Sequence, residues 1–318
     1  MAIGPYDHVA DLTADRVRAE GLDLTFVQLP VEQILQRFAR YREWEVSEFS
    51  LAQYVALRSR GDESLIAIPV FPSRVFRHGS VYVRAGGIDD MSALAGRRVG
   101  IPEWAQTAGV WARGILASEY DVALDSVEWV QAGLDEPGRA ESVETTLPDG
   151  VRLERRPDTS LGALLRAGEI DAVISARPPR NADGRIVRLL ADHVAAEKDW
   201  WRRTHIHPIM HVVVLRADVY AEIPWCAANL LAAFDEARRS SLRRLLDTAM
   251  SHVALPWAAE LLADASDGDP LDWWAYGTEA NRRTLQAFVD FAVAQGVAAA
   301  PVAAERLFAR ETLFSTRI

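Results

Sequence analysis

A cluster of cationic and hydroxyl side chains follows one short apolar run near residue 70. Residues 65–70 read as a buried strand, and Ser73, Arg74, Arg77 and His78 come shortly after it. A guanidinium can hold a carboxylate through two parallel hydrogen bonds, and a histidine changes charge near neutral pH. Because the chain as a whole is acidic, this local positive charge predicts an anion-binding site at the edge of a sheet. The alternative is that both arginines pair with acidic groups at the surface.

A second candidate segment, residues 97–119, reads as a strand, a loop and a helix that begins at Thr107. The N-terminus of a helix offers free N–H groups and a partial positive charge, so it can bind a carboxylate. Thr107 would either cap that helix or contact a ligand. Trp104 could stack on an aromatic ligand or belong to the core. Glu103, at the end of the strand, is a candidate proton donor, with a solvated surface carboxylate as the alternative.

Three histidines with odd residue numbers lie close together near residue 210. An extended strand would place His205, His207 and His211 on one face, and histidine is a common metal ligand. Pro208 interrupts such a strand, however, and no acidic residue lies at a matching spacing. We therefore predict no metal site, and we expect His211 to face the site while the other two histidines lie in a loop.

Two further polar residues complete the set of candidates. Glu48 lies in a short predicted strand, residues 45–49, and Tyr6 lies near the start of the chain. The alternatives are a solvated carboxylate for Glu48 and a frayed terminus for Tyr6. We expect both side chains at the same site.

Composition excludes several classes of function. The 318 residues carry a formal net charge of −10, and 49% of them are hydrophobic, as in an ordinary globular protein. The acidic balance disfavours nucleic acid as a partner. Cys226 is the single cysteine, which excludes disulfides, cysteine-ligated zinc and iron–sulfur clusters within one chain. The single lysine, Lys198, lies in a polar run and does not suit a Schiff-base cofactor, so we expect no cofactor.

Several familiar motifs and targeting signals are missing from the sequence. We find no glycine-rich nucleotide loop, zinc-protease motif or nucleophile elbow. The N-terminus lacks the basic and apolar regions of a secretory signal, and residues 291–304 are too short and alanine-rich to span a membrane. We therefore expect a cytoplasmic protein without a membrane partner.

Short apolar runs alternate with helical patterns over the first two-thirds of the chain, which predicts an α/β protein. We expect strands at residues 22–27, 45–49, 65–70, 97–101 and 169–174, and helices at residues 31–41, 51–60, 107–119 and 161–168. Residues 131–160 read as an irregular excursion. Beyond residue 215 the periodicity is helical.

This order of elements predicts a two-lobed, type II periplasmic-binding-protein-like fold. Strands 80–84 and 210–215 would cross between the lobes, and the C-terminal helices would return to lobe one. Lobe one would comprise residues 1–83 and 212–318, and lobe two residues 84–211.

Three segments carry a resemblance to a known family. They read PVFPSRVFRH at residues 69–78, VGIPEW and TAGVWARG within residues 99–114, and HPIMHVVV at residues 207–214. They resemble the 4,5-dihydroxyphthalate decarboxylase family, and the resemblance extends over nearly the whole chain, being weakest at residues 135–160. It implies a carboxy-lyase of aromatic compound catabolism, as in phthalate degradation, which acts without an organic cofactor.

The resemblance also implies roles for the candidate residues. Such an enzyme would protonate the ring carbon that bears the carboxylate and then release CO2. We expect His211 or Glu103 to deliver the proton, and His78 is a third catalytic candidate. The other candidates are assigned to binding of a small aromatic carboxylate: Ser73, Arg74, Arg77, Thr107, Trp104, Tyr6 and Glu48.

Two alternatives share the predicted fold. One is a solute-binding protein that serves a transporter, against which the missing signal argues. The other is a different lyase, similar to the naphthoate synthase of menaquinone synthesis or to chorismate dehydratase. The sequence leaves the substrate and the oligomeric state, including a homo-oligomer, open.

Overall fold

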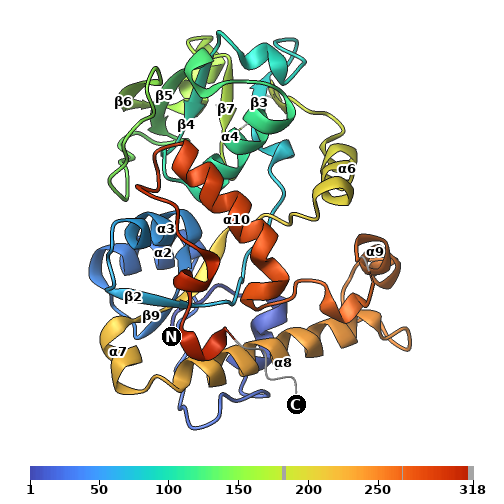
Figure 1. The fold of residues 1–318 in the computed structure, drawn as a ribbon. Coiled ribbons are helices and arrows are strands. Elements are labelled where there is room, and N and C mark those ends of the chain that lie inside the picture. Colours follow the sequence, from blue (N-terminus) through green and yellow to red (C-terminus); the bar gives the residue numbers. More distant parts are fainter. Residues whose placement is uncertain (181–183, 267, 314–318) are drawn as a thin grey trace.

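The computed structural model describes residues 1–180, 184–266 and 268–313, and its strands form two separate sheets (Figure 1). The three-stranded sheet has the order β1-β9-β2, with antiparallel strands at Val46–Ser50, His211–Arg216 and Leu65–Ile68. The six-stranded mixed sheet has the order β6-β5-β4-β7-β3-β8, with strands at Arg152–Ser160, Glu128–Gly133, Arg98–Ile101, Ala172–Ile174, Val81–Arg84 and Ile186–Arg188. Each sheet is the centre of one lobe, which confirms the predicted two-lobed α/β architecture.

Helices cover both sheets. Lobe one carries α1 (Ala10–Thr13), α2 (Val31–Tyr41), α3 (Leu51–Ser59), α7 (Ala217–Glu222) and α8 (Cys226–Leu246). Lobe two carries α4 (Thr107–Glu119), α5 (Leu161–Ala167) and α6 (His193–Thr204), and the chain ends with α9 (Ala258–Ala265) and α10 (Thr278–Ala294). Short 3₁₀ turns lie at Asp7–Val9, His78–Ser80, Ser92–Leu94, Leu124–Ser126, Pro270–Asp272, Ala304–Leu307 and Arg310–Thr312. Every helix in the described ranges is too short or too polar to span a lipid bilayer.

The chain crosses between the lobes through residues 69–80 and 205–210. These segments run antiparallel, because Arg74 and Ile209 form an isolated bridge and the N–H of Met210 donates to the carbonyl of Ser73 over 2.8 Å. The expected crossing strands at residues 80–84 and 210–215 are therefore both wrong in position. Residues 81–84 form β3, which is hydrogen-bonded on both sides within the six-stranded sheet. Residues 211–216 form β9, which is hydrogen-bonded on both sides within the three-stranded sheet.

The N-terminal segment lies beside β1. Ala2 forms an isolated bridge with Val27, and the N–H of Glu48 donates to the carbonyl of Ala2 over 2.9 Å. Residues 22–27, expected as a strand, therefore contribute only one bridge. Because the first residues of the chain are paired in this way, residues 4–6 lie next to the middle of β1.

Helix α10 packs against both lobes, not against lobe one alone as expected. Figure 1 shows it running diagonally between the two sheets, and it contacts α3 of lobe one and α4 of lobe two. The ring of Trp111 in α4 lies 5.4 Å from Phe288 and 5.7 Å from Phe291, both in α10. A Cβ atom at Gly114 would lie only 2.2 Å from the Phe291 ring. The closeness of the two helices therefore depends on Gly114.

We expect Gly114→Ala to lower the free energy of unfolding by about 1–3 kcal/mol, because the added methyl group overpacks the α4–α10 contact. Denaturant unfolding followed by circular dichroism measures this change. The matched control is Gly162→Ala in α5, where a methyl group meets its nearest atoms at 3.4 Å and should raise stability through helix propensity. Equal effects of the two variants would contradict the packing argument.

Candidate functional site

Glu48 and His211 form a hydrogen-bonded pair at the centre of the candidate site. Nδ1 of His211 lies 2.6 Å from Oε1 of Glu48, with Glu48 fully buried and the His211 side chain 16% exposed. The register of β1 and β9 places Ser50 opposite His211 and Glu48 opposite Val213, so the two side chains are diagonal neighbours on one face. Only the imidazole of this pair can reach a ligand.

The Glu48 carboxylate accepts three hydrogen bonds. Oε1 accepts from His211 and from the Tyr6 hydroxyl at 2.5 Å, and Oε2 accepts from the Gly4 N–H at 2.8 Å. Burial alone would raise the pKa of Glu48, but the bonds from His211, Tyr6 and Gly4 outweigh it and lower that pKa. An ionised carboxylate only accepts, so Nδ1 of His211 carries a proton. Nε2 is then left to exchange a proton with a ligand.

Ser50 and Thr107 join the N-termini of two helices, one from each lobe. Their hydroxyl oxygens lie 2.9 Å apart, and the Thr107 hydroxyl also accepts from the N–H of Ala52 over 3.1 Å. Thr107 therefore links the lobes and does not cap its own helix, because α4 has no side-chain cap. Since Ser50 lies opposite His211, the positive end of α4 lies next to the imidazole.

Arg77 is a buried cation that forms no ion pair with a carboxylate of the described residues, although the nearby charge of Glu197 raises its pKa. Its Nε and Nη2 donate to the sulfur of Met210 at 3.2 and 2.9 Å, and Nη1 donates to the carbonyl of Ala176 at 3.3 Å. A thioether is a weak acceptor, so much of the donor capacity of Arg77 remains for a ligand. Burial lowers the pKa of Arg77 to about 10, which keeps it charged at neutral pH. Met210 directly precedes His211 in the chain, so Arg77 contacts the neighbour of that histidine.

Arg74 is also buried, but its guanidinium is already engaged. Nη2 donates to the carbonyl of Ala275 at 2.9 Å and to the side chain of Asn281 at 2.5 Å, and Nη1 donates to the carbonyl of His207 at 3.4 Å. Burial lowers the pKa of Arg74 to about 9. These bonds tie the first crossing segment to the start of α10, and within the described part of the chain only Nε of this guanidinium lacks a partner. Arg77 is thus the better candidate for holding a carboxylate.

Glu103 and Trp104 are placed in a different network. The Glu103 carboxylate accepts from Arg139 at 2.9 Å and from the N–H of Ser142 at 2.8 Å, so neither oxygen is unoccupied. Trp104 has no exposed surface, and the guanidinium of Arg113 lies 4.0 Å from its ring centroid. Glu103 ties the loop before α4 to residues 139–142, and the indole N–H of Trp104 donates to the carbonyl of Gln295. Sequence spacing gave no signal for these partners. The prediction of an irregular stretch at residues 131–160 is right only for its middle, because residues 131–133 belong to β5 and Arg152–Ser160 form β6.

His78 lies on the first crossing segment, packed edge-on against Trp200 with their ring centroids 5.3 Å apart. It is only 3% exposed. Burial lowers the pKa of His78 to about 4, so its imidazole is neutral at neutral pH. This position favours a structural role over proton delivery.

The other two histidines near residue 210 do not share a face with His211. His205 ends α6 in the left-handed conformation, with a φ of 52°. His207 is buried between the rings of Phe76 and Trp273, at 4.9 and 5.0 Å. Across the described ranges, no group of three or more His, Cys, Asp or Glu side chains is close enough to hold a metal ion.

His8 and Tyr276 lie near Glu48 and were not candidates in the sequence. The ring of His8 is 5.3 Å from that of Tyr6, and burial lowers the pKa of His8 to about 4. Tyr276 is almost fully buried, and burial raises its pKa. Nε2 of His8 and the hydroxyl of Tyr276 have no partner among the described residues. Tyr276 lies in the loop before α10. The carbonyl of its neighbour Ala275 accepts a hydrogen bond from Arg74, 201 positions earlier in the chain, and no local sequence pattern indicates this contact.

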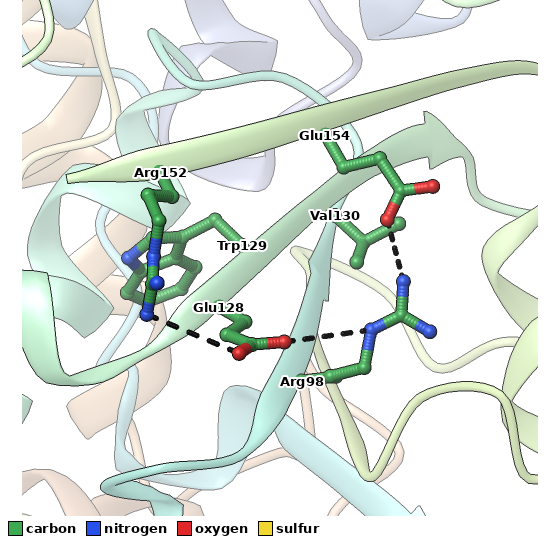
Figure 2. A pocket seen from close by; sticks show the side chains of 6 residues that line it. All are labelled: Arg98, Glu128, Trp129, Val130, Arg152 and Glu154. Atoms are coloured by element: carbon green, nitrogen blue, oxygen red, sulfur yellow. Dashed lines mark hydrogen bonds and ion pairs between the residues drawn. The ribbon is translucent and has the colours of Figure 1, made fainter.

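Figure 2 shows a separate surface pocket at strands β4, β5 and β6 of lobe two. Arg98 pairs with Glu154 at 2.5 Å and with Glu128 at 3.9 Å, and Arg152 pairs with Glu128 at 3.9 Å. Two cations and two anions balance each other there. The pocket therefore offers no uncompensated charge to a carboxylate, unlike the surroundings of Arg77.

Two curated relatives of the chain are both 4,5-dihydroxyphthalate decarboxylases. The 4,5-dihydroxyphthalate decarboxylase of Comamonas testosteroni is 35% identical over 323 aligned positions, which cover 100% of this chain and 98% of that enzyme. The 4,5-dihydroxyphthalate decarboxylase of Pseudomonas putida is 36% identical over 207 positions, which cover 64% of this chain and 80% of that enzyme. No protein-family model matches the chain.

Solved structures resemble the chain in fold. A protein of Archaeoglobus fulgidus aligns with a TM-score of 0.50 at 17% identity, over 93% of this chain and 97% of its own. The alkanesulfonate-binding protein of Xanthomonas axonopodis pv. citri aligns with a TM-score of 0.49 at 12% identity, over 99% and 97% of the two chains. At such identities the likeness concerns the fold alone.

We expect the protein to lose stability as the pH falls from about 6.5 to 4, and His78→Phe to reduce this loss. An unfolded histidine takes up a proton near pH 6.5, whereas His78 does so only near its lowered pKa of about 4. The unfolded state therefore binds more protons in this window, and acid favours it by up to about 3 kcal/mol. Denaturant midpoints measured from pH 7 to 4 give the slope. His252→Phe, at a more exposed position, is the control, and equal slopes for wild type and His78→Phe would contradict the assignment.

Proposed function

This chain belongs to the 4,5-dihydroxyphthalate decarboxylase family, and we propose that it removes CO2 from a hydroxylated, phthalate-like aromatic acid beside His211. The observation that carries the proposal is the pair of Glu48 and His211, in which a buried carboxylate holds a partly exposed imidazole in a defined orientation. Such a pair supplies a proton at a fixed position. Binding alone does not require it.

The charges around the pair suit an acid with two carboxylates. Arg77 supplies one buried positive charge, and the uncapped N-terminus of α4 supplies a partial one. The charges of Glu48 and a protonated His211 cancel. A dianion that reached from His211 to Arg77 would therefore meet one positive charge on the first crossing segment and the partial positive charge at the start of α4.

The proposed reaction adds a proton to the ring carbon that carries the leaving carboxylate. Nε2 of His211 donates this proton, and a ring hydroxyl para to that carbon supplies the electron pair, giving a dienone-like intermediate. The bond between ring and carboxylate then breaks, its electron pair restores the aromatic ring, and CO2 leaves. His211 regains a proton from solvent, so each turnover consumes one proton. Glu48 stabilises the imidazolium before the transfer and holds the ring in place afterwards.

The test is incubation of metal-stripped protein with 4,5-dihydroxyphthalate, with chromatography of the dihydroxybenzoate product and measurement of CO2. We expect turnover by the wild type and a loss of about 10²–10⁴-fold in kcat for Glu48→Gln, because the amide no longer stabilises the imidazolium. Substrate binding by calorimetry should remain.

Glu45→Gln is the matched control, since Glu45 is exposed and lies directly before the same strand, and it should keep wild-type turnover. Binding without product by the wild type would support a solute-binding protein of this fold instead. Full activity of Glu48→Gln would remove the pair from the mechanism.

We expect Arg77→Met to weaken binding of the dicarboxylate by about 10–100-fold, because one charge-assisted contact with a carboxylate is lost. Calorimetry measures the dissociation constant, and circular dichroism checks that the variant is folded. The comparison ligand is the corresponding monocarboxylate, for which the loss should be smaller. The same loss for both ligands would mean that Arg77 does not hold the second carboxylate.

A further inference from the structure

We infer that Tyr6 is a positioning residue that acts through Glu48 and controls how readily His211 releases its proton. This inference rests on the proposed function of His211 as the proton donor. It replaces the role in substrate binding that the sequence suggested for Tyr6.

The geometry places both groups on one oxygen atom. Oε1 of Glu48 accepts from the Tyr6 hydroxyl at 2.5 Å and lies 2.6 Å from Nδ1 of His211. The two donors therefore compete for the same negative charge. A strong bond from the phenol withdraws charge from Oε1 and weakens the hold of Glu48 on the imidazolium.

The N-terminal segment is built to keep Tyr6 in this position. The carbonyl of Ala2 accepts from the N–H of Glu48 at 2.9 Å, and Gly4 donates to Oε2 of the same carboxylate at 2.8 Å. A Cβ atom at Gly4 would lie 2.8 Å from the Tyr6 ring and 3.2 Å from Oε2, so only glycine allows this approach. Pro5 then fixes the backbone between the two donors.

The hydroxyl of Tyr6 stays a donor over the whole working range of pH. Burial raises the pKa of Tyr6, and the nearby charge of Glu48 raises it further. A tyrosine that contacted substrate as an acid or base would need the opposite shift. Tyr6 is thus suited to donate a permanent hydrogen bond and not to transfer a proton.

The other titratable groups around Glu48 do not change charge between about pH 5 and 8. His8, from the N-terminal segment, is neutral because burial lowers its pKa to about 4. Tyr276, from the loop before α10, is neutral because burial raises its pKa. Arg74 and Arg77, from the crossing segment, keep their charge with pKa values of about 9 and 10. None of these groups therefore accounts for a limb of the pH–rate profile in this range.

The test is Tyr6→Phe, with kcat and KM measured from pH 5 to 9. We expect the alkaline limb of kcat to move up by about half a unit to one unit, because the freed carboxylate holds the imidazolium proton more strongly. The maximal kcat should fall several-fold, and KM should change less than twofold. Glu48→Gln should move the limb in the opposite direction.

Tyr54→Phe is the matched control, because Tyr54 is a buried tyrosine whose hydroxyl bonds the backbone of Ala67 and Leu307. It should leave the limb in place. An NMR titration of the His211 ring nitrogens follows the same effect without substrate, and its midpoint should also rise in Tyr6→Phe. This readout stays informative even if the wild type decarboxylates none of the acids tried, so the two proposals can fail separately. A raised KM with an unchanged limb and midpoint would overturn the inference and return Tyr6 to substrate binding.

Discussion

The negative charge of Glu48 is the constraint on which the site depends, because an ionised carboxylate without exposed surface is stable only with donors on all sides. The N-terminal segment contributes two donors, Gly4 and Tyr6, β9 contributes His211, and β1 holds Glu48 itself. Their arrangement explains why the first residues of the chain are ordered against the sheet. Within the pair of Glu48 and His211, it leaves only the imidazole with exposed surface.

The two lobes meet at this cluster, and each contributes to it. Lobe one supplies the pair, and lobe two supplies the N-terminus of α4. The crossing segments supply Met210, the neighbour of His211 in the chain, and Arg77, which donates to the Met210 sulfur. A ligand bound here would contact both lobes. Because the contact of Ser50 with Thr107 already joins them, the distance between the lobes affects the geometry of the proposed site directly.

Structural elements outside the cluster hold the two lobes in place relative to each other. Helix α10 packs on α4 through Phe288 and Phe291, while Arg74 joins the crossing segment to Asn281 at the start of the same helix. The irregular excursion binds the loop before α4 through Glu103. These contacts explain why two of the candidate residues, Arg74 and Glu103, are occupied by the protein itself.

Local sequence patterns were enough to predict the α/β class and most helices, because periodicity is set by a few neighbouring residues. They also identified the cationic segment with Arg77 and selected His211 as a candidate site residue. The tertiary structure alone decided which of these residues meet. The register of β1 against β9 brings Glu48 to His211 across 163 positions, and Tyr6 arrives through the pairing of the N-terminus. Glu103 lies outside the site because it bonds Arg139 and Ser142. These partners lie in an irregular stretch, which has no periodicity that a sequence pattern could reveal. Pairing between distant segments depends on the packing of the whole chain, and a single sequence carries no local signal for it.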